Sequence, residues 1–215
     1  MTKLKLMTTG AALCLIFALS CVMTASAAHA QEGPFKIRVQ GKYFIGSGVI
    51  DRRTPGRLAK AMADHKNIKV LVLSYGPGSD DDEAKLQASR MVRNAGLTTV
   101  VPAKGLIASG GTDMFLAGKR RIVEKGACVG VHSWVAGNRQ GADFPDNSGE
   151  HRLYLDYYRA IGINPDFYWF TLDAADADEM HWMSVSEINA FRVATRKLTH
   201  GGESEDRRYD RCDRR

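Results

Sequence analysis

The chain has 215 residues, of which 44% are hydrophobic and 25% charged, and its formal net charge is +6 at pH 7. This length is enough for one folded domain with a sizeable core. Much of the basic excess lies close to the C-terminus, in Arg207, Arg208, Arg211, Arg214 and Arg215. Positive charge confined to a tail is typical of a solvated segment rather than of a nucleic-acid-binding face, so we expect no nucleic-acid partner.

Residues 1–30 have the pattern of a secretion signal. Lys3 and Lys5 precede an apolar run over residues 11–22, and Ala28-His29-Ala30 is a small-x-small cleavage site. The apolar run is shorter than the about 20 residues that a membrane-spanning helix needs. We therefore expect cleavage before Gln31, a periplasmic or secreted protein, and no transmembrane segment after cleavage.

Strand-like and helix-like segments then alternate. Residues 35–39 and 43–50 are predicted strands, and the aliphatic run at residues 70–73 is typical of a strand covered on both faces. Helical apolar spacing follows around Leu58 and over residues 84–95. Residues 98–101 and 128–132 are further predicted strands, whereas residues 106–111 are predicted to be a glycine-containing turn that leads into a helix.

The second half is predicted to be a polar loop followed by helices. Residues 133–149 are glycine-rich and polar, typical of a loop or lid. Helical segments follow around Tyr154 and over residues 165–172, and Ser184-x-x-Glu187 is a capping box that opens another helix. His151 and His181 are expected to be surface or capping groups.

This alternation predicts one α/β domain over residues 31–199, built from parallel βαβ units, with a charged tail at residues 200–215. In such sheets, ligands bind at the carboxyl ends of the strands. The turn from Gly76 to Gly78, Ser109 and His132 each follow a predicted strand. We therefore expect these three positions to meet at one edge of the sheet.

Ser109 and His132 are the candidate nucleophile and base. A serine hydroxyl becomes a good nucleophile only when a base accepts its proton. The N–H of Gly110, at the start of a predicted helix, and a glycine N–H from the turn could stabilise a developing oxyanion. Which glycine of the turn would donate, Gly76 or Gly78, is left open.

Three segments carry a family resemblance: residues 70–78, Val-Leu-Val-Leu-Ser-Tyr-Gly-Pro-Gly; residues 108–118, with Ala-Ser-Gly-Gly followed by Phe-Leu-Ala-Gly; and residues 130–133, Gly-Val-His-Ser. Their order resembles the Clp protease proteolytic subunit, in the Clp protease/crotonase superfamily, and the context of Ser109 is similar to that in signal peptide peptidase A. The resemblance implies a Clp protease/crotonase-like βαβ superhelix with a mostly parallel sheet.

The same resemblance implies an exported serine hydrolase of the peptidase type. Its substrate would be a peptide or an ester, and copies of the chain would associate, since family members often form rings. The family places a third catalytic residue, an Asp, before a segment that Met183-Ser184-Val185-Ser186-Glu187 resembles. Asp173, Asp176 and Asp178 are candidates, and Asp176 is favoured. The turn here is Tyr-Gly-Pro-Gly where the family has Ser-Pro-Gly-Gly.

The sequence is also compatible with other functions. The fold could serve as a non-catalytic binding or assembly module, or as a crotonase-like acyl-thioester enzyme. A Ser–Lys dyad with Lys104 or Lys197 as base is a further variant. No metal or cofactor is expected, because the sequence has no Cys/His cluster at metal-ligand spacing and no phosphate-binding loop. Export would allow a disulfide between Cys128 and Cys212, but the sequence does not show whether they meet.

Overall fold

The computed structural model describes residues 33–199 and 212–213. The predicted signal and its cleavage site lie outside the described residues, as does most of the predicted tail. Among the described residues, no helix is long and apolar enough to cross a membrane.

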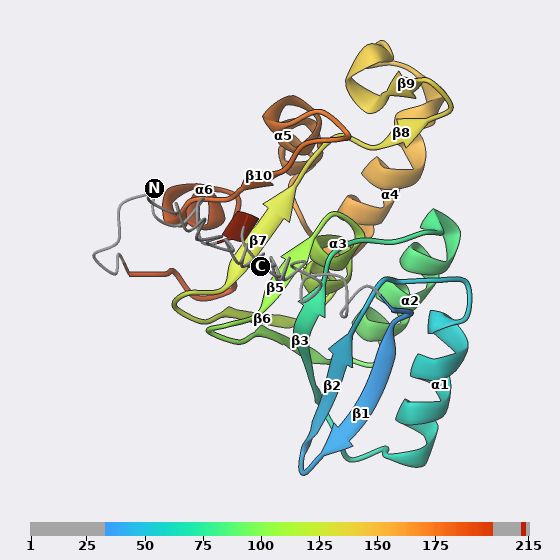
Figure 1. Cartoon of the computed structure of the whole chain (residues 1–215), viewed down its shortest axis with the longest axis vertical. Coiled ribbons are helices and arrows are strands. Elements are labelled where there is room, and N and C mark those ends of the chain that lie inside the picture. Colours follow the sequence, from blue (N-terminus) through green and yellow to red (C-terminus); the bar gives the residue numbers. More distant parts are fainter. Residues whose placement is uncertain (1–32, 200–211, 214–215) are drawn as a thin grey trace, which may run out of the picture.

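A mixed, eight-stranded sheet forms the centre of the molecule (Figure 1). Its main path runs β1-β2-β3-β5-β7-β10, and β4 pairs with both β3 and β6. Only the β1/β2 and β7/β10 pairs are antiparallel, whereas the other five pairs are parallel. The predicted α/β fold with a mostly parallel sheet is confirmed. The strands are β1 (Lys36–Gln40), β2 (Tyr43–Ser47), β3 (Val70–Gly76), β4 (Thr98–Val101), β5 (Leu106–Ala108), β6 (Arg120–Val123), β7 (Cys128–Val131) and β10 (His181–Trp182).

The turn predicted at residues 106–111 is wrong in its first half, because Leu106–Ala108 is strand β5 and pairs with both β3 and β7. Three residues are too few to show the period-2 alternation of a strand. Their extended form is fixed by the neighbouring strands, which satisfy the backbone on both sides. This correction places a strand directly before Ser109.

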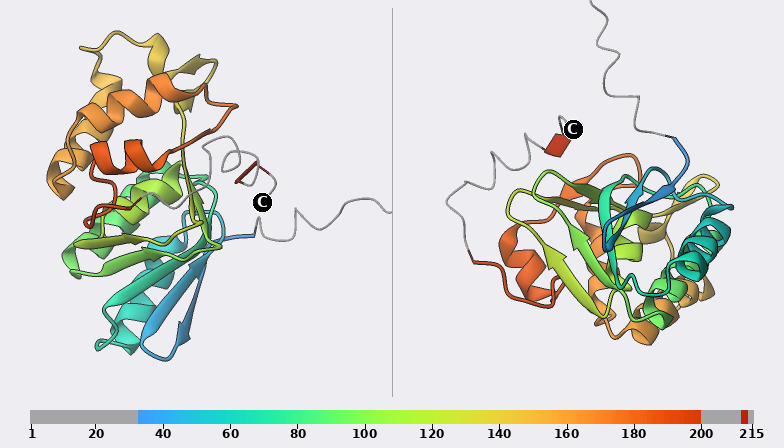
Figure 2. Two further views of the ribbon diagram at one scale, coloured as in Figure 1. Left: turned by 90° about the vertical axis from the view of Figure 1, so that its left-hand side faces the viewer. Right: turned by 90° about the horizontal axis from the view of Figure 1, so that it is seen from below.

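Helices lie mainly on one side of the sheet (Figure 2). They are α1 (Thr54–Asp64), α2 (Asp82–Asn94), α3 (Gly110–Leu116), α4 (Arg152–Ile161), α5 (Asp166–Ala174) and α6 (Val185–Ala190). The predicted capping box is present at the start of α6, where Ser184 and Glu187 bond each other's backbone N–H groups. The apolar core between helices and sheet includes Leu71, Leu73, Ile107, Phe115 and Val129.

Residues 133–151 fold back over the helices. They contain the short hairpin of β8 (Val135–Ala136) and β9 (Arg139–Gln140) and two single 3-10 turns. Trp134 stacks on both Phe144 and Tyr154, with ring centroids 5.4 and 5.6 Å apart respectively. The predicted loop is therefore an ordered layer held by aromatic side chains.

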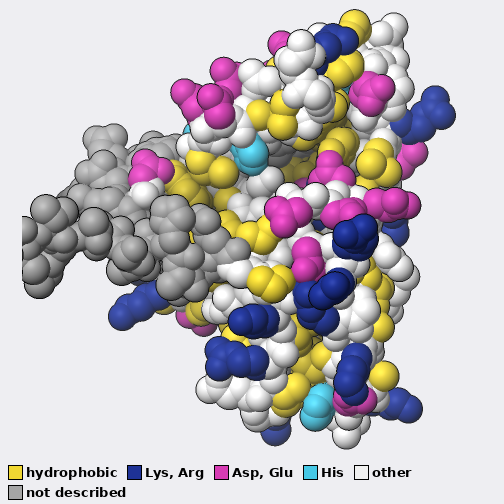
Figure 3. All heavy atoms as spheres, turned by 45° about the vertical axis from the view of Figure 1, so that its right-hand side comes forward, with side chains coloured by type: hydrophobic (Ala, Val, Ile, Leu, Met, Phe, Trp, Pro, Cys, Tyr) yellow, Lys and Arg dark blue, Asp and Glu magenta, His cyan; other side chains and the backbone are white. Residues whose placement is uncertain are grey.

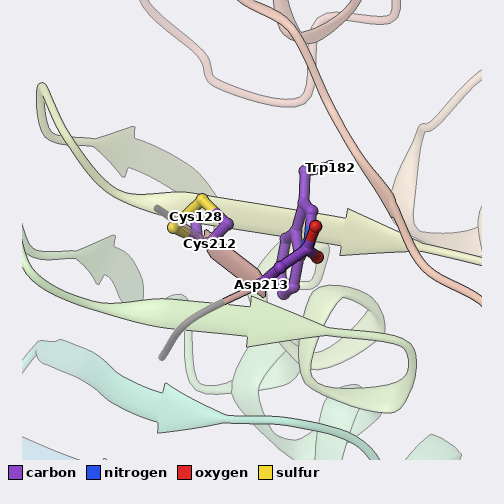
Figure 4. The surroundings of a disulfide bond; sticks show 4 residues. All are labelled: Cys128, Trp182, Cys212 and Asp213. Atoms are coloured by element: carbon purple, nitrogen blue, oxygen red, sulfur yellow. A yellow bond between two sulfur atoms is a disulfide. The ribbon is translucent and has the colours of Figure 1, made fainter. Parts of the chain in front are cut away.

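The opposite side of the sheet carries a disulfide. Cys128 and Cys212 pair, with their Cα atoms 5.8 Å apart, which answers the question that the sequence left open (Figure 4). Trp182 lies beside this bond and donates its indole N–H to Asp213. A Cβ on Gly130 would lie 2.8 Å from the Trp182 ring, so glycine lets the indole approach β7 closely. Cys212 is thus bonded to the strand that precedes His132.

Candidate active site

Three parallel strands end at the same edge of the sheet and bring three predicted site segments together. Gly76 of β3 lies opposite Ile107 of β5, and Ala108 of β5 lies opposite Gly130 of β7. Because the strands are parallel and in this register, Gly78, Ser109 and His132 follow their strands on the same edge. All three line one open groove of about 420 Å³.

Ser109 has an unusual backbone conformation. Its φ is 50° and its ψ is −124°, and Arg192 is the only other described non-glycine residue with a positive φ. Such conformations are strained for residues with a side chain and occur often at functional sites. Ser109 occupies the N-cap position of α3, but its hydroxyl makes no capping hydrogen bond. The Ser109 hydroxyl is therefore not used to cap the start of α3.

The glycines around Ser109 allow this turn to pack closely against β3. A Cβ on Gly111 would lie 2.0 Å from the carbonyl oxygen of Gly76, and one on Gly110 would lie 2.5 Å from Ser79 Oγ. Gly78 faces the nucleophile, since its Cβ position is 4.0 Å from Ser109 Oγ. Gly76 instead belongs to β3 and packs on α3. Of the two candidates in the turn, Gly78 is the one next to the hydroxyl.

His132 is half-buried and is oriented by the main chain. Its Nδ1 lies 3.0 Å from the carbonyl oxygen of Ala177, an arrangement that favours the tautomer with the proton on Nδ1. Burial lowers the pKa of His132, and this effect outweighs the Ala177 carbonyl and the charge of Asp113, which raise it. The ring is therefore neutral near pH 7 and able to accept a proton.

The predicted third residue does not lie against His132. Asp176 is exposed, as are Asp173 and Asp178, and the next residue, Ala177, supplies the acceptor for Nδ1 through its backbone. The chain here turns so that the Asp176 carbonyl accepts the N–H of Glu179. The orienting acceptor in this structure is a neutral carbonyl rather than a carboxylate.

Ser109 and His132 face the same space, although their side chains make no direct hydrogen bond with each other. Both also line an inner cavity of about 60 Å³ that lies between α2, α3, α4 and α5. Catalytic hydrogen bonds are often longer without substrate and shorten when it binds. The inner cavity is lined by Asp82, Lys85, Thr112, Asp113, Val131, Trp134, Tyr154, Tyr158, Phe167, Tyr168 and Thr171, in addition to Ser109 and His132.

A charge cluster in this cavity, of which Lys85 and Asp113 are buried, was missed by the sequence interpretation. Lys85 lies 2.8 Å from Asp82 and 3.1 Å from Asp113, and the hydroxyls of Tyr154 and Tyr158 donate to these two carboxylates. The signal was present, because residues 85, 88 and 92 share one face of α2 and that face is otherwise apolar. Asp113, in the otherwise uncharged α3, was the matching clue.

Lys85 is a cation rather than a base. Burial lowers the pKa of its ammonium group, but the negative charges of Asp113 and Asp82 outweigh that effect, so the pKa is raised overall. The lysines considered for a Ser–Lys dyad, Lys104 and Lys197, are exposed and do not line the cavity.

Among the described residues, no group of His, Cys, Asp or Glu could hold a metal ion. On the face shown in Figure 3, acidic side chains gather across the middle and upper part, and basic side chains gather mainly below them.

The structure is a mixed α/β fold with a mostly parallel sheet. No family model and no curated protein matches the chain. Similar solved structures include a membrane-bound stomatin-specific protease, with 14% identity over 71% of this chain and 76% of that chain and a TM-score of 0.48. A protein from Hyphomonas neptunium assigned to the enoyl-CoA hydratase/isomerase family has 15% identity, coverage of 83% and 74%, and a TM-score of 0.47. One from Streptomyces coelicolor assigned as an enoyl-CoA hydratase has 12% identity, coverage of 91% and 78%, and a TM-score of 0.48. Likeness at this level says nothing about activity, which has to be judged from the residues of this chain.

Proposed function

We propose that this protein is a serine hydrolase of the peptidase type, which transfers the acyl group of a peptide or ester to Ser109 and then to water. The observation that carries the proposal is the backbone of Ser109. A serine held at φ 50° between a strand and a helix, with its hydroxyl not used as a cap, is a strained arrangement that folding alone does not require. It lies beside a histidine with one ring nitrogen already bonded.

In the proposed reaction, His132 donates Nδ1–H to the Ala177 carbonyl, which leaves Nε2 with a lone pair. Ser109 Oγ attacks the substrate carbonyl carbon while Nε2 accepts the serine proton. The imidazolium then protonates the leaving amine or alcohol, and the bond to the leaving group breaks. Water, deprotonated by His132, attacks the acyl-serine ester, and the proton returns to Ser109 as the acid is released.

The backbone N–H groups of Gly110 and Gly78 are the proposed oxyanion donors. Gly110 is the first residue of α3, and Gly78 lies next to the Ser109 hydroxyl across the groove. Each such donor contributes about 3 kcal/mol to the stability of the transition state where this has been measured. Gly76 is assigned a packing role instead, because its carbonyl lies against Gly111.

We place this activity in the periplasm or outside the cell. Two features support that proposal: the signal-like residues 1–30 and the disulfide between Cys128 and Cys212. Disulfides form and persist mainly in oxidising compartments.

A non-catalytic binding module is the second candidate function. It is favoured by the neutral acceptor at His132 Nδ1, because a carboxylate there would stabilise the imidazolium better than the Ala177 carbonyl does. An acyl-thioester enzyme would use the same two N–H donors, but no described contact favours it.

Labelling with a fluorophosphonate probe separates these functions. The hydrolase predicts that the wild-type protein becomes covalently labelled and that Ser109→Ala does not, whereas Ser148→Ala, outside both cavities, labels as the wild type does. His132→Gln is expected to label slowly and the exposed His65→Gln normally. Folded wild-type protein that stays unlabelled over about pH 6 to 9, where a histidine base is mostly neutral, would contradict the hydrolase and favour the binding module.

A further inference from the structure

Lys85 is the most deeply buried charged side chain near the nucleophile. Its residue is 3% exposed, and its ammonium also lies 4.8 Å from the ring centroid of Tyr154. The aliphatic part packs on the turn that follows Ser109, since a Cβ on Gly110 would lie 2.9 Å from Lys85 Cδ. The side chain therefore reaches from α2 to the residue that supplies a proposed oxyanion donor.

Asp113 connects the ammonium of Lys85 to the nucleophile through α3. The Asp113 N–H donates to the carbonyl of Ser109, and the Asp113 carboxylate accepts from Lys85 and from the hydroxyl of Tyr158. The Asp113 carbonyl accepts the hydroxyl of Tyr157. The turn that carries Ser109 is thus tied to α2 by one ion pair and to α4 by two tyrosines.

We propose that Lys85 is a positioning residue of this site: its buried side chain fixes the turn that carries Ser109 and Gly110, and its charge, paired with Asp113, acts on the ring of His132. This inference rests on the proposed hydrolase. Lys85 touches no reacting atom in this proposal and transfers no proton.

Several charged or titratable groups share the two cavities with His132. Asp113 faces it from α3, Lys85 and Asp82 from α2, and the tyrosines 154, 158 and 168 from α4 and α5. Asp178 and Glu179 line the outer groove. Asp113 raises the pKa of the imidazole and Lys85 lowers it, so the two members of the ion pair act in opposite directions. Removing Lys85 should therefore raise the pKa of His132, and removing the charge of Asp113 should lower it.

The test is a charge cycle on the pair, K85M, D113N and the double variant. The pH dependence of probe labelling gives one midpoint, and NMR titration of the His132 ring gives the other without requiring activity. We expect K85M to move both midpoints to higher pH and D113N to move them to lower pH. At a pH about one unit below the wild-type midpoint, K85M should label roughly threefold or more slowly than wild type. K85R, which keeps the charge, should return the midpoint toward the wild-type value.

The double variant separates charge from positioning. It should have a midpoint near that of wild type but a lower labelling rate on the alkaline plateau, because the turn has lost its ion pair. It also guards against misfolding, since K85M alone leaves the buried Asp113 carboxylate without its cation, whereas the double variant removes that charge as well. Lys60→Met, which removes an exposed lysine paired with Asp64, is the matched control and should shift nothing.

The outcomes keep the two proposals apart. Equal His132 midpoints in K85M and D113N would overturn the electrostatic role of Lys85, and a double variant with the wild-type plateau rate would overturn its positioning role. A wild-type protein that never reacts with the probe would instead remove the hydrolase. The NMR midpoints would still report in that case whether Lys85 acts on His132.

Discussion

Two histidines lie in neighbouring regions of this molecule and are used in different ways. His132, at the edge of the sheet, has one described hydrogen-bond partner, the Ala177 carbonyl, at Nδ1. His151, which contacts Trp134, Phe144 and Pro145, is completely buried and has partners at both ring nitrogens. A half-buried ring whose second nitrogen has no described partner can accept a proton from a substrate or nucleophile. A ring with both nitrogens hydrogen-bonded instead stabilises the structure around it.

The region around His151 is a continuous aromatic and hydrogen-bonded layer. The indole N–H of Trp134 donates to the Tyr168 hydroxyl at 2.8 Å, and that hydroxyl lies 2.7 Å from His151 Nδ1. His151 Nε2 lies 3.1 Å from the Pro145 carbonyl. These hydrogen bonds connect residues 133–149 to α5. Trp134 also lines the inner cavity. The layer shapes the site without contributing a reacting group.

The largest expected effect is at the sheet edge. Ser109→Ala and His132→Ala should each reduce fluorophosphonate labelling more than about a thousandfold, because nucleophile and base act as one unit. The free energy of unfolding should change by less than about 1 kcal/mol, since neither side chain fills the core. Labelling kinetics and urea denaturation of the same samples measure both quantities. Rapid labelling of a folded Ser109→Ala protein would show that another residue is the nucleophile.

The opposite pattern is expected for the aromatic layer. His151→Ala should lower the free energy of unfolding by about 2–4 kcal/mol, because it leaves a cavity in the aromatic layer and removes one hydrogen-bond partner of the buried Tyr168 hydroxyl. The labelling rate per folded molecule should change little. His65→Ala, on the exposed end of α1, is the control and should change the stability by less than about 0.5 kcal/mol. A His151→Ala protein as stable as wild type would break the contrast between the two regions.

A smaller effect should reveal the strain at the nucleophile. Ser109→Gly and Ser109→Ala both remove the hydroxyl, but only glycine adopts a positive φ without strain. We expect Ser109→Gly to be more stable than Ser109→Ala by about 1 kcal/mol, with both unlabelled. The difference between their urea midpoints measures it. Equal midpoints would mean that the turn is relaxed, and the main support for the hydrolase would be lost.

The smallest effect is the contribution of His132 to the pH dependence of stability. Burial lowers its pKa in the folded state below the usual 6.5, so the unfolded chain binds a proton first as the pH falls. Stability should therefore decrease from about pH 6.5 down to the lowered folded-state value, and be unaffected above that window. His132→Gln should flatten this part of the curve relative to wild type, as measured by urea denaturation at several pH values. A slope unchanged by the substitution would assign it to other groups.

The sequence was a good guide to the sheet edge and a poor one to its surroundings. Gly78, Ser109 and His132 were found because each follows an apolar run, and parallel strands end at a common edge. His151, expected at the surface, is fully buried, and its polar flanking residues gave no sign of this because Trp134 and Phe144, which pack on it, belong to a segment that precedes its helix. Asp176 was selected by its place in the chain, yet its neighbour Ala177 supplies the contact to His132.

By itself, the sequence determined the alternation of strands and helices, the mostly parallel sheet and the residue types at the strand ends, because local periodicity and turn chemistry are properties of neighbouring residues. Only the tertiary structure decided which distant groups meet. The ion pair of Lys85 with Asp113 joins two helices, the Cys128–Cys212 bond spans 84 residues of sequence, and the extended form of Leu106–Ala108 depends on two flanking strands. Such contacts form because burial leaves charges, thiols and backbone groups with few partners, and which partner lies within reach is set by the packing of the whole sheet.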